Sequence, residues 1–338
     1  MSNKQVQRIV ALLLFGGLLY KIQGTLLPII LSLVLFYLLS PLVNLFVKVF
    51  PKKFKFGRDL SILAAFLVFL VLLWLAIDLV VPSLVSEFNQ LSASFPEMIA
   101  QLQLVVKTGQ QWYLANRLPA AIDRAVFDGI NNTFNFIALF LQQTALSVVG
   151  IFAQFIGLIV IPVIVYYMLK DEDNLVSGIV KIVPTDHKVF AQTIIERISY
   201  ILKSYIEGQL LICSLIGIVT GIGLYFLGIK YYLVLGLIAG VTELIPFIGP
   251  ILGAIPAVII AFLVSPALAI KVTAFYVVLQ SLGAYILVPK VMGNKLDLHP
   301  LTILLGILIL GNLIGVWGIL FAAPIIAILK AVYLELKK

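Results

Sequence analysis

The sequence predicts an all-α polytopic membrane protein with about eight membrane segments, two of them broken or re-entrant hairpins, plus a small helical extracytoplasmic domain. Of 338 residues, 62% are hydrophobic and 11% charged, with a mean hydropathy of +1.16, which excludes a soluble globular domain. Several apolar windows exceed the roughly 18 residues typical of a membrane helix. Two apolar segments, 231–264 and 300–334, are each about 50 Å long as straight helices, too long for one crossing.

The charged and chemically reactive residues exclude several functions. The net charge of +8 comes from basic residues at the ends of apolar segments, which indicates topology signals and contacts with anionic lipids rather than nucleic-acid binding. A single cysteine, Cys213, excludes a disulfide framework. The sequence contains no metal-ligand spacing, phosphate-binding loop or nucleophile arrangement, so we expect neither an enzyme nor a bound cofactor or metal.

The N-terminal half is expected to alternate between membrane and water. Residues 1–82 hold membrane helices 1–3, with an uncleaved first helix, a turn at Gly24–Pro28 and a third span from about Leu60 to Val81. Residues 83–143 mix polar and apolar side chains and predict a helical domain outside the hydrocarbon, with a helix starting near Ser94. A fourth membrane helix covers 144–170, and 171–204 is a cytoplasmic amphipathic segment.

Residues 205–338 form the predicted membrane core, in which each plain span precedes a broken segment. The breaks are expected where proline removes main-chain donors and glycine loosens the helix. Broken helices at membrane depth are where many transporters bind solutes. The predicted break residues are Pro246, Gly249, Pro250, Gly253 and Pro256 in segment 231–264, and Gly311 and Gly315 in segment 300–334.

The positive-inside rule gives the predicted topology. It assigns the basic loops 48–58 and 170–204 to the cytoplasm, which places both termini inside and 83–143 outside the membrane. If segment 231–264 enters and leaves on the outer side, Lys290 and Lys295 also lie inside. The two span-plus-hairpin units are then inverted relative to each other, as in many transporters.

Polar residues within the apolar core are the candidates for a solute pathway. Glu243 precedes the first break, and an intramembrane carboxylate is a functional candidate by default, although it could instead bond the freed backbone donors. His299, before the second broken segment, could couple proton movement to gating or simply fix a loop. The remaining pathway candidates, Gln209, Asn312, Glu207 and Gln280, could contact solute or serve in helix packing.

Several motifs together resemble the bacterial autoinducer-2 exporter family. They occur in the family's order, and the likeness is strongest after residue 200: Tyr205–Gln209, Glu243–Pro250, Pro289–Gly293, Leu298–Pro300, Gly311–Gly315 and Ala323–Pro324. The resemblance implies an inner-membrane permease with about eight membrane segments that forms a homo-oligomer. It also implies a cargo that differs among members: autoinducer-2 in some, sodium or lithium exchanged for protons in others.

We therefore expect a permease that exports a small polar solute such as autoinducer-2, with possible coupling to protons through Glu243 and His299. One alternative is a monovalent cation/proton antiporter. A second alternative, from another class, is a membrane scaffold that organises an envelope complex through residues 83–143.

Overall fold

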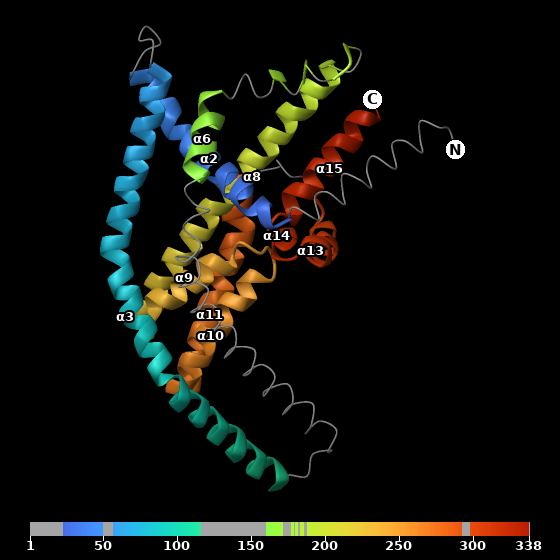
Figure 1. Cartoon of the computed structure of the whole chain (residues 1–338). Coiled ribbons are helices and arrows are strands. Elements are labelled where there is room, and N and C mark those ends of the chain that lie inside the picture. The colour runs from blue at the N-terminus through green and yellow to red at the C-terminus, as the bar shows by residue number, and fades with distance from the viewer. Residues whose placement is uncertain are drawn as a thin grey trace. The chain divides into compact units, whose positions relative to one another are not determined.

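The computed structural model describes residues 23–49, 57–115, 160–171, 177–178, 180–181, 183–185, 188–292 and 298–337 (Figure 1). Regular structure in these ranges is helical throughout, which confirms the predicted all-α class. Four helices are long and apolar enough to cross a membrane, with spans at Leu31–Lys48, Gly57–Ser94, Lys188–Phe226 and Pro266–Met292. The chain is thus a multi-pass membrane protein.

The chain divides into two compact units. The first comprises Met1–Leu73, Ile156–Leu210 and Pro289–Lys338, and the second comprises Trp74–Phe155 and Leu211–Val288. The helices contained in the first unit are α2 (Gln23–Val49), α6 (Val160–Lys170), α13 (Pro300–Ile314), α14 (Val316–Leu320) and α15 (Ala322–Leu336). Those contained in the second are α9 (Tyr232–Thr242), α10 (Gly249–Val264), α11 (Pro266–Leu282) and η2 (Gly283–Leu287). Helices α3 (Gly57–Ala115) and α8 (Lys188–Phe226) contribute to both units, and α12 (Val288–Met292) begins at their boundary.

At four positions where the sequence predicts a helix boundary, the structure has a continuous helix. The turn at Gly24–Pro28 lies inside α2, which begins at Gln23. Helix α3 continues through Pro82 and past Ser94 for 59 residues, and α8 joins the amphipathic segment to the fifth span. A proline removes one bond of the ladder and can bend a helix that neighbouring turns keep intact, so Pro28, Pro82 and Pro96 do not end theirs. The rest of the predicted domain, 116–143, lies outside the described residues.

The first broken segment is a helical hairpin, as predicted. Helix α9 ends at Thr242, the chain turns through residues 243–248, and α10 packs back against α9. Pro246 lies in the turn and Pro250 in the first turn of α10, whereas Gly253 and Pro256 lie farther along that helix. Gly249 and Gly253 face Thr242 so closely that a side chain on either would collide with it. The glycines therefore set the spacing of the hairpin.

The second broken segment also reverses direction. Helix α13 ends at Ile314, and Gly315 turns the chain with φ 64° and ψ −143°, a conformation that favours glycine. Helices α14 and α15 both pack against α13. Leu298, just before α13, packs against the cluster that holds Ala327 and Ala331, so the two ends of the hairpin lie together. Gly311, a predicted break residue, lies inside α13, one turn before the reversal.

Glycines also bring α8 and α9 into close contact. Gly217 and Gly221 of α8 face Gly236 and Gly240 of α9, with the two pairs at the same four-residue spacing. A Cβ on Gly236 would stand 2.8 Å from the Gly217 carbonyl oxygen and 3.0 Å from the backbone of Gly221. Small residues at such a spacing allow membrane helices to approach closely, and dispersion contacts then hold them.

This contact yields a first prediction. Gly236→Ala should lower the free energy of unfolding by about 1–3 kcal/mol, because the obstructing atoms are backbone and cannot rotate away. Unfolding of the purified protein in detergent would measure it. Gly178→Ala is the matched control, since no atom lies within 4 Å of a Cβ there. Equal stability of the two variants would contradict the packing argument.

Candidate functional site

Glu243 and Gln280 meet at the turn of the first hairpin. Gln280 Nε2 of α11 donates to Glu243 Oε2 at 3.3 Å, and both side chains are half-buried. Both residues are among the predicted pathway candidates, but 37 positions separate them in the sequence. The structure thus brings two separately predicted residues together as one polar pair within the second unit.

Four backbone N–H groups of the turn find hydrogen-bond acceptors other than the Glu243 carboxylate. The amide N–H groups of Leu244, Ile245, Ile248 and Gly249 each donate to a main-chain carbonyl within the turn or at the end of α9. The Thr242 hydroxyl likewise donates to the carbonyls of Ile238 and Ala239. The Glu243 carboxylate is therefore not needed to bond these donors, which was the alternative role considered for it.

A π-helical segment, η2, begins three residues after Gln280. The amide of Val288 donates to the carbonyl of Gly283, which is the wide spacing of a π-helix, and Gly283 lies against Gln280 and Ile216. Short π-helical segments occur frequently at functional sites because they free a backbone carbonyl and redirect side chains. The polar pair thus lies between a helix break on one side and an irregular helix on the other.

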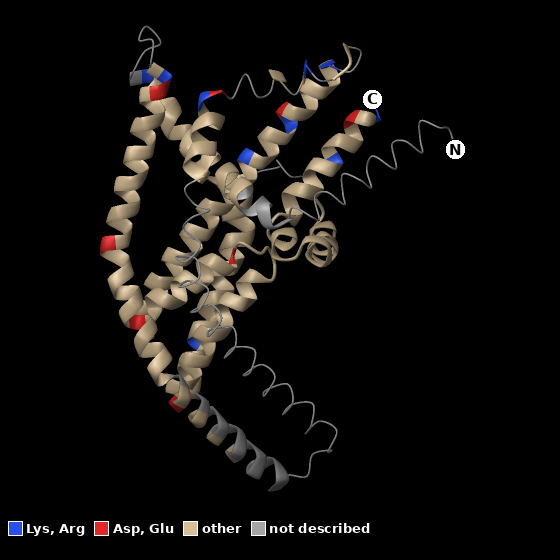
Figure 2. Ribbon diagram, viewed as in Figure 1, with Lys and Arg blue, Asp and Glu red and all other residues tan. Residues whose placement is uncertain are grey.

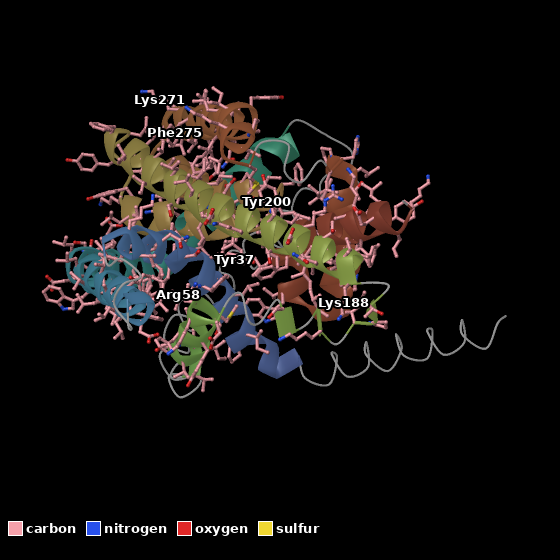
Figure 3. The ribbon with its side chains drawn as sticks, turned by 90° about the horizontal axis from the view of Figure 1, so that it is seen from above. Tyr37, Arg58, Lys188, Tyr200, Lys271 and Phe275 are labelled. Carbon is pink, nitrogen blue, oxygen red and sulfur yellow. The ribbon has the colours of Figure 1, made fainter. Side chains whose placement is uncertain are left out.

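Tyr276 fixes α11 to the hairpin. Its buried hydroxyl donates to the carbonyl oxygen of Gly253 at 3.2 Å. One turn away from Tyr276 is Gln280, so this bond holds the helix that carries the pair. Phe275, labelled in Figure 3, fills the space in which a side chain on Gly223 of α8 would stand.

The other candidates belong to the first unit. Gln209 is 8% exposed and Glu207 is half-buried, both on α8. Asn312 is exposed, and its amide donates to the Leu308 carbonyl of its own helix at 2.9 Å. His299 caps α13, since its Nδ1 accepts from the Leu301 amide at 3.2 Å. Neither of these two hydrogen bonds joins Asn312 or His299 to another candidate residue.

Glu87 was not among the predicted candidates, and its carboxylate accepts hydrogen bonds from the amides of Leu233 and Val234 at the start of α9. Tyr205 begins one of the motifs that carry the resemblance, but no partner was predicted for it; its hydroxyl donates to the Leu320 carbonyl at 2.9 Å and ties α8 to α14. Each is polar in a largely apolar neighbourhood. Their partners are main-chain atoms more than 100 positions away, which no local pattern reveals.

Charged residues gather at one end of the first unit (Figure 2). Arg58, labelled in Figure 3, donates twice to the Leu169 carbonyl at the end of α6, at 2.9 and 2.7 Å. Lys170 pairs with Asp59 at 3.1 Å and donates a second hydrogen bond to the Tyr166 hydroxyl at 3.3 Å, and these two bonds raise the pKa of Lys170 above its ordinary value. Arg197 of α8 pairs with Glu335 of α15 at 3.1 Å. These pairs connect the basic segments that the positive-inside rule assigned to one side.

The described residues include no group of three or more His, Cys, Asp or Glu that could hold a metal ion. The Glu243–Gln280 pair offers hydrogen-bond donors and acceptors within an apolar setting. Apolar helices, two helical hairpins and a polar pair at a helix break together define a membrane transporter.

The chain belongs to the AI-2E family of transporters, because the model of that family, described as "AI-2E family transporter", matches residues 9–338. It is 32% identical to the "Putative transport protein YueF" of Bacillus subtilis over 91% of this chain and 83% of the relative. It is 27% identical to the "Putative permease PerM" of Escherichia coli over 98% and 93% of the two chains. A protein of Halobacillus andaensis named "Sodium-lithium/proton antiporter" is 24% identical over 94% and 92%.

The Tyr276 contact yields a second prediction. Tyr276→Phe should lower the free energy of unfolding by about 1 kcal/mol, because a buried hydrogen bond to Gly253 is lost without a change in shape. Denaturant titration in mixed micelles would measure it. Tyr285→Phe, at a site 82% exposed, provides the control. Tyr276→Phe with wild-type stability would show that the bond contributes nothing to the hairpin.

Proposed function

We propose that the chain is a permease that exports a small polar solute such as autoinducer-2 across the bacterial inner membrane, with Glu243 and Gln280 as the solute contact. The observation that carries the proposal is the 3.3 Å hydrogen bond between these two side chains at a helix break. A carboxylate and an amide offer both acceptors and donors to a polar solute. Gln209, Glu207 and Asn312 are proposed as further residues of the pathway.

The lengths of the helices support a site deep in the membrane. Helix α9 has 11 residues, about 16 Å, which is roughly half of a hydrocarbon core ~30 Å thick. A hairpin that enters from the outer side would carry Glu243 to about the midplane. A carboxylate at that depth is costly unless solute, a proton or water reaches it. Proton coupling through Glu243 follows as part of the proposal.

The runner-up is exchange of sodium or lithium for protons. The Halobacillus andaensis relative carries that activity in its name, and its similarity covers nearly the whole chain. A lone carboxylate could serve both activities, because main-chain carbonyls at a break can complete a cation site. The cargo therefore has to be decided by transport measurements.

A transport assay provides the third prediction. Purified protein in liposomes should accelerate efflux of autoinducer-2 over empty liposomes, with a rate that depends on pH. Glu243→Gln, which keeps the shape but cannot ionise, should abolish that pH dependence and slow proton-coupled efflux by about a hundredfold or more, the magnitude typical of a lost proton-transfer group. Glu196→Gln, on the exposed face of α8, should behave as wild type.

Each possible result of this assay favours a different function. Sodium- or lithium-driven proton movement that Glu243→Gln abolishes would favour the antiporter. A wild-type protein that moves none of these solutes would refute both transport functions.

We further propose that both termini are cytoplasmic and that residues 83–143 are extracytoplasmic, as the positive-inside rule predicts. The ion pairs Lys170–Asp59 and Arg197–Glu335 support a common side for the basic segments. From Gly57 to Ser86, α3 is about 44 Å long, which exceeds the ~30 Å hydrocarbon core. We propose in addition that the chain forms a homo-oligomer among membrane lipids.

Cysteine labelling of intact cells gives the fourth prediction. In a Cys213→Ala background, a membrane-impermeant maleimide should label Ser86→Cys and leave Lys181→Cys and Lys337→Cys unlabelled until the cells are permeabilised. All three positions are exposed, so access depends on the membrane alone. Labelling of Lys181→Cys in intact cells would reverse the proposed orientation.

A further inference from the structure

Helix α9 begins without a cap of its own. Its first flanking residue, Tyr231, has left-handed backbone angles of φ 63° and ψ 30°, which are unfavourable for a bulky residue, and its side chain makes no capping bond. The free N–H groups at a helix start need acceptors, and a carboxylate is favoured there because the helix dipole is positive at that end.

Glu87 of α3 supplies this cap from a distant part of the chain. Its Oε2 accepts from the Leu233 amide at 3.0 Å and from the Val234 amide at 3.1 Å. Two charge-assisted bonds to one oxygen fix the position of the α9 N-terminus against α3. The residues involved lie 146 and 147 positions apart in the sequence.

Further contacts hold the same stretch of α3 on the hairpin. Ser94 Oγ lies 3.0 Å from the hydroxyl of Tyr231, two turns beyond Glu87. Between them Leu91 is 3% exposed and belongs to the core cluster that also contains Val234, Leu235 and Ile238 of α9. Helix α3 is thus joined to the start of α9 by polar bonds and by a shared core.

We infer that Glu87 is a positioning residue for the Glu243–Gln280 site, an inference that rests on the proposed function. Glu87 bonds the first turn of α9, and the same 11-residue helix ends at Thr242, directly before Glu243. Because a short α-helix is stiff along its axis, a change at its start moves its end. The Glu87 carboxylate thereby sets the depth and rotation at which Glu243 faces Gln280.

The experiment measures how fast a small maleimide reacts with Glu243→Cys in a Cys213→Ala background, in the full-length protein in liposomes. Adding Glu87→Gln should change that rate threefold to tenfold, the magnitude that loss of a helix cap has on an equilibrium. Adding Glu87→Asp, which keeps the charge, should restore most of the wild-type rate. Adding Glu97→Gln, the same change at an exposed site of α3, should leave the rate unaltered.

An unchanged labelling rate in the Glu87→Gln protein would overturn the inference. If that protein does not fold, Ser94→Ala serves instead, because it removes the companion bond to Tyr231 and should also change the rate. An unchanged rate in Ser94→Ala would again contradict the inference.

Transport separates the positioning role from the proposed function. With Cys213 and Glu243 intact, Glu87→Gln should raise the KM for autoinducer-2 or sodium efflux, whichever the wild type moves, in addition to any fall in the unfolding midpoint. A lower midpoint with the wild-type KM would indicate a purely structural cap. Suppose that Glu87→Gln alters the labelling rate but the wild-type protein transports neither solute. The inference that Glu87 positions residue 243 would then stand, and only the proposed function would be refuted.

Discussion

A helix that breaks inside a membrane must find partners for its freed main-chain groups within the protein, because hydrocarbon offers none. The first hairpin uses its own backbone for this, since the amides of Leu244, Ile245, Ile248 and Gly249 bond to nearby carbonyls. The Glu243 carboxylate in turn accepts a hydrogen bond from Gln280. The site therefore depends on a turn in which these four amides pair with main-chain carbonyls.

Close helix contact is the second condition for the site. Glycines at three places let backbone meet backbone: between α8 and α9, between α9 and α10, and at the α13–α14 reversal. Lipid tails are as apolar as leucine, so membrane helices gain little from burying large side chains and much from close dispersion contacts. The glycines thus make the hairpins compact enough to hold polar groups away from lipid.

The two hairpins differ in the polar groups they present. The first carries Glu243 beside Gln280, whereas Asn312 in the second bonds to its own helix and His299 caps the start of that helix. These hydrogen bonds of Asn312 and His299 thus have their partners in α13 itself. The polar chemistry concentrates on the first hairpin and on α11.

The sequence alone determined the membrane class, the two broken segments and the candidates Glu243 and Gln280, because hydropathy, proline, glycine and intramembrane charge are local signals. It misplaced the ends of α3 and α8, since neighbouring turns can carry a helix through Pro82 or a change in polarity. Only the tertiary structure decided that Gln280 faces Glu243 and that Glu87 caps α9. Those contacts join residues 37 and 146 positions apart, and such pairing depends on how helices pack, which no local pattern of residues encodes.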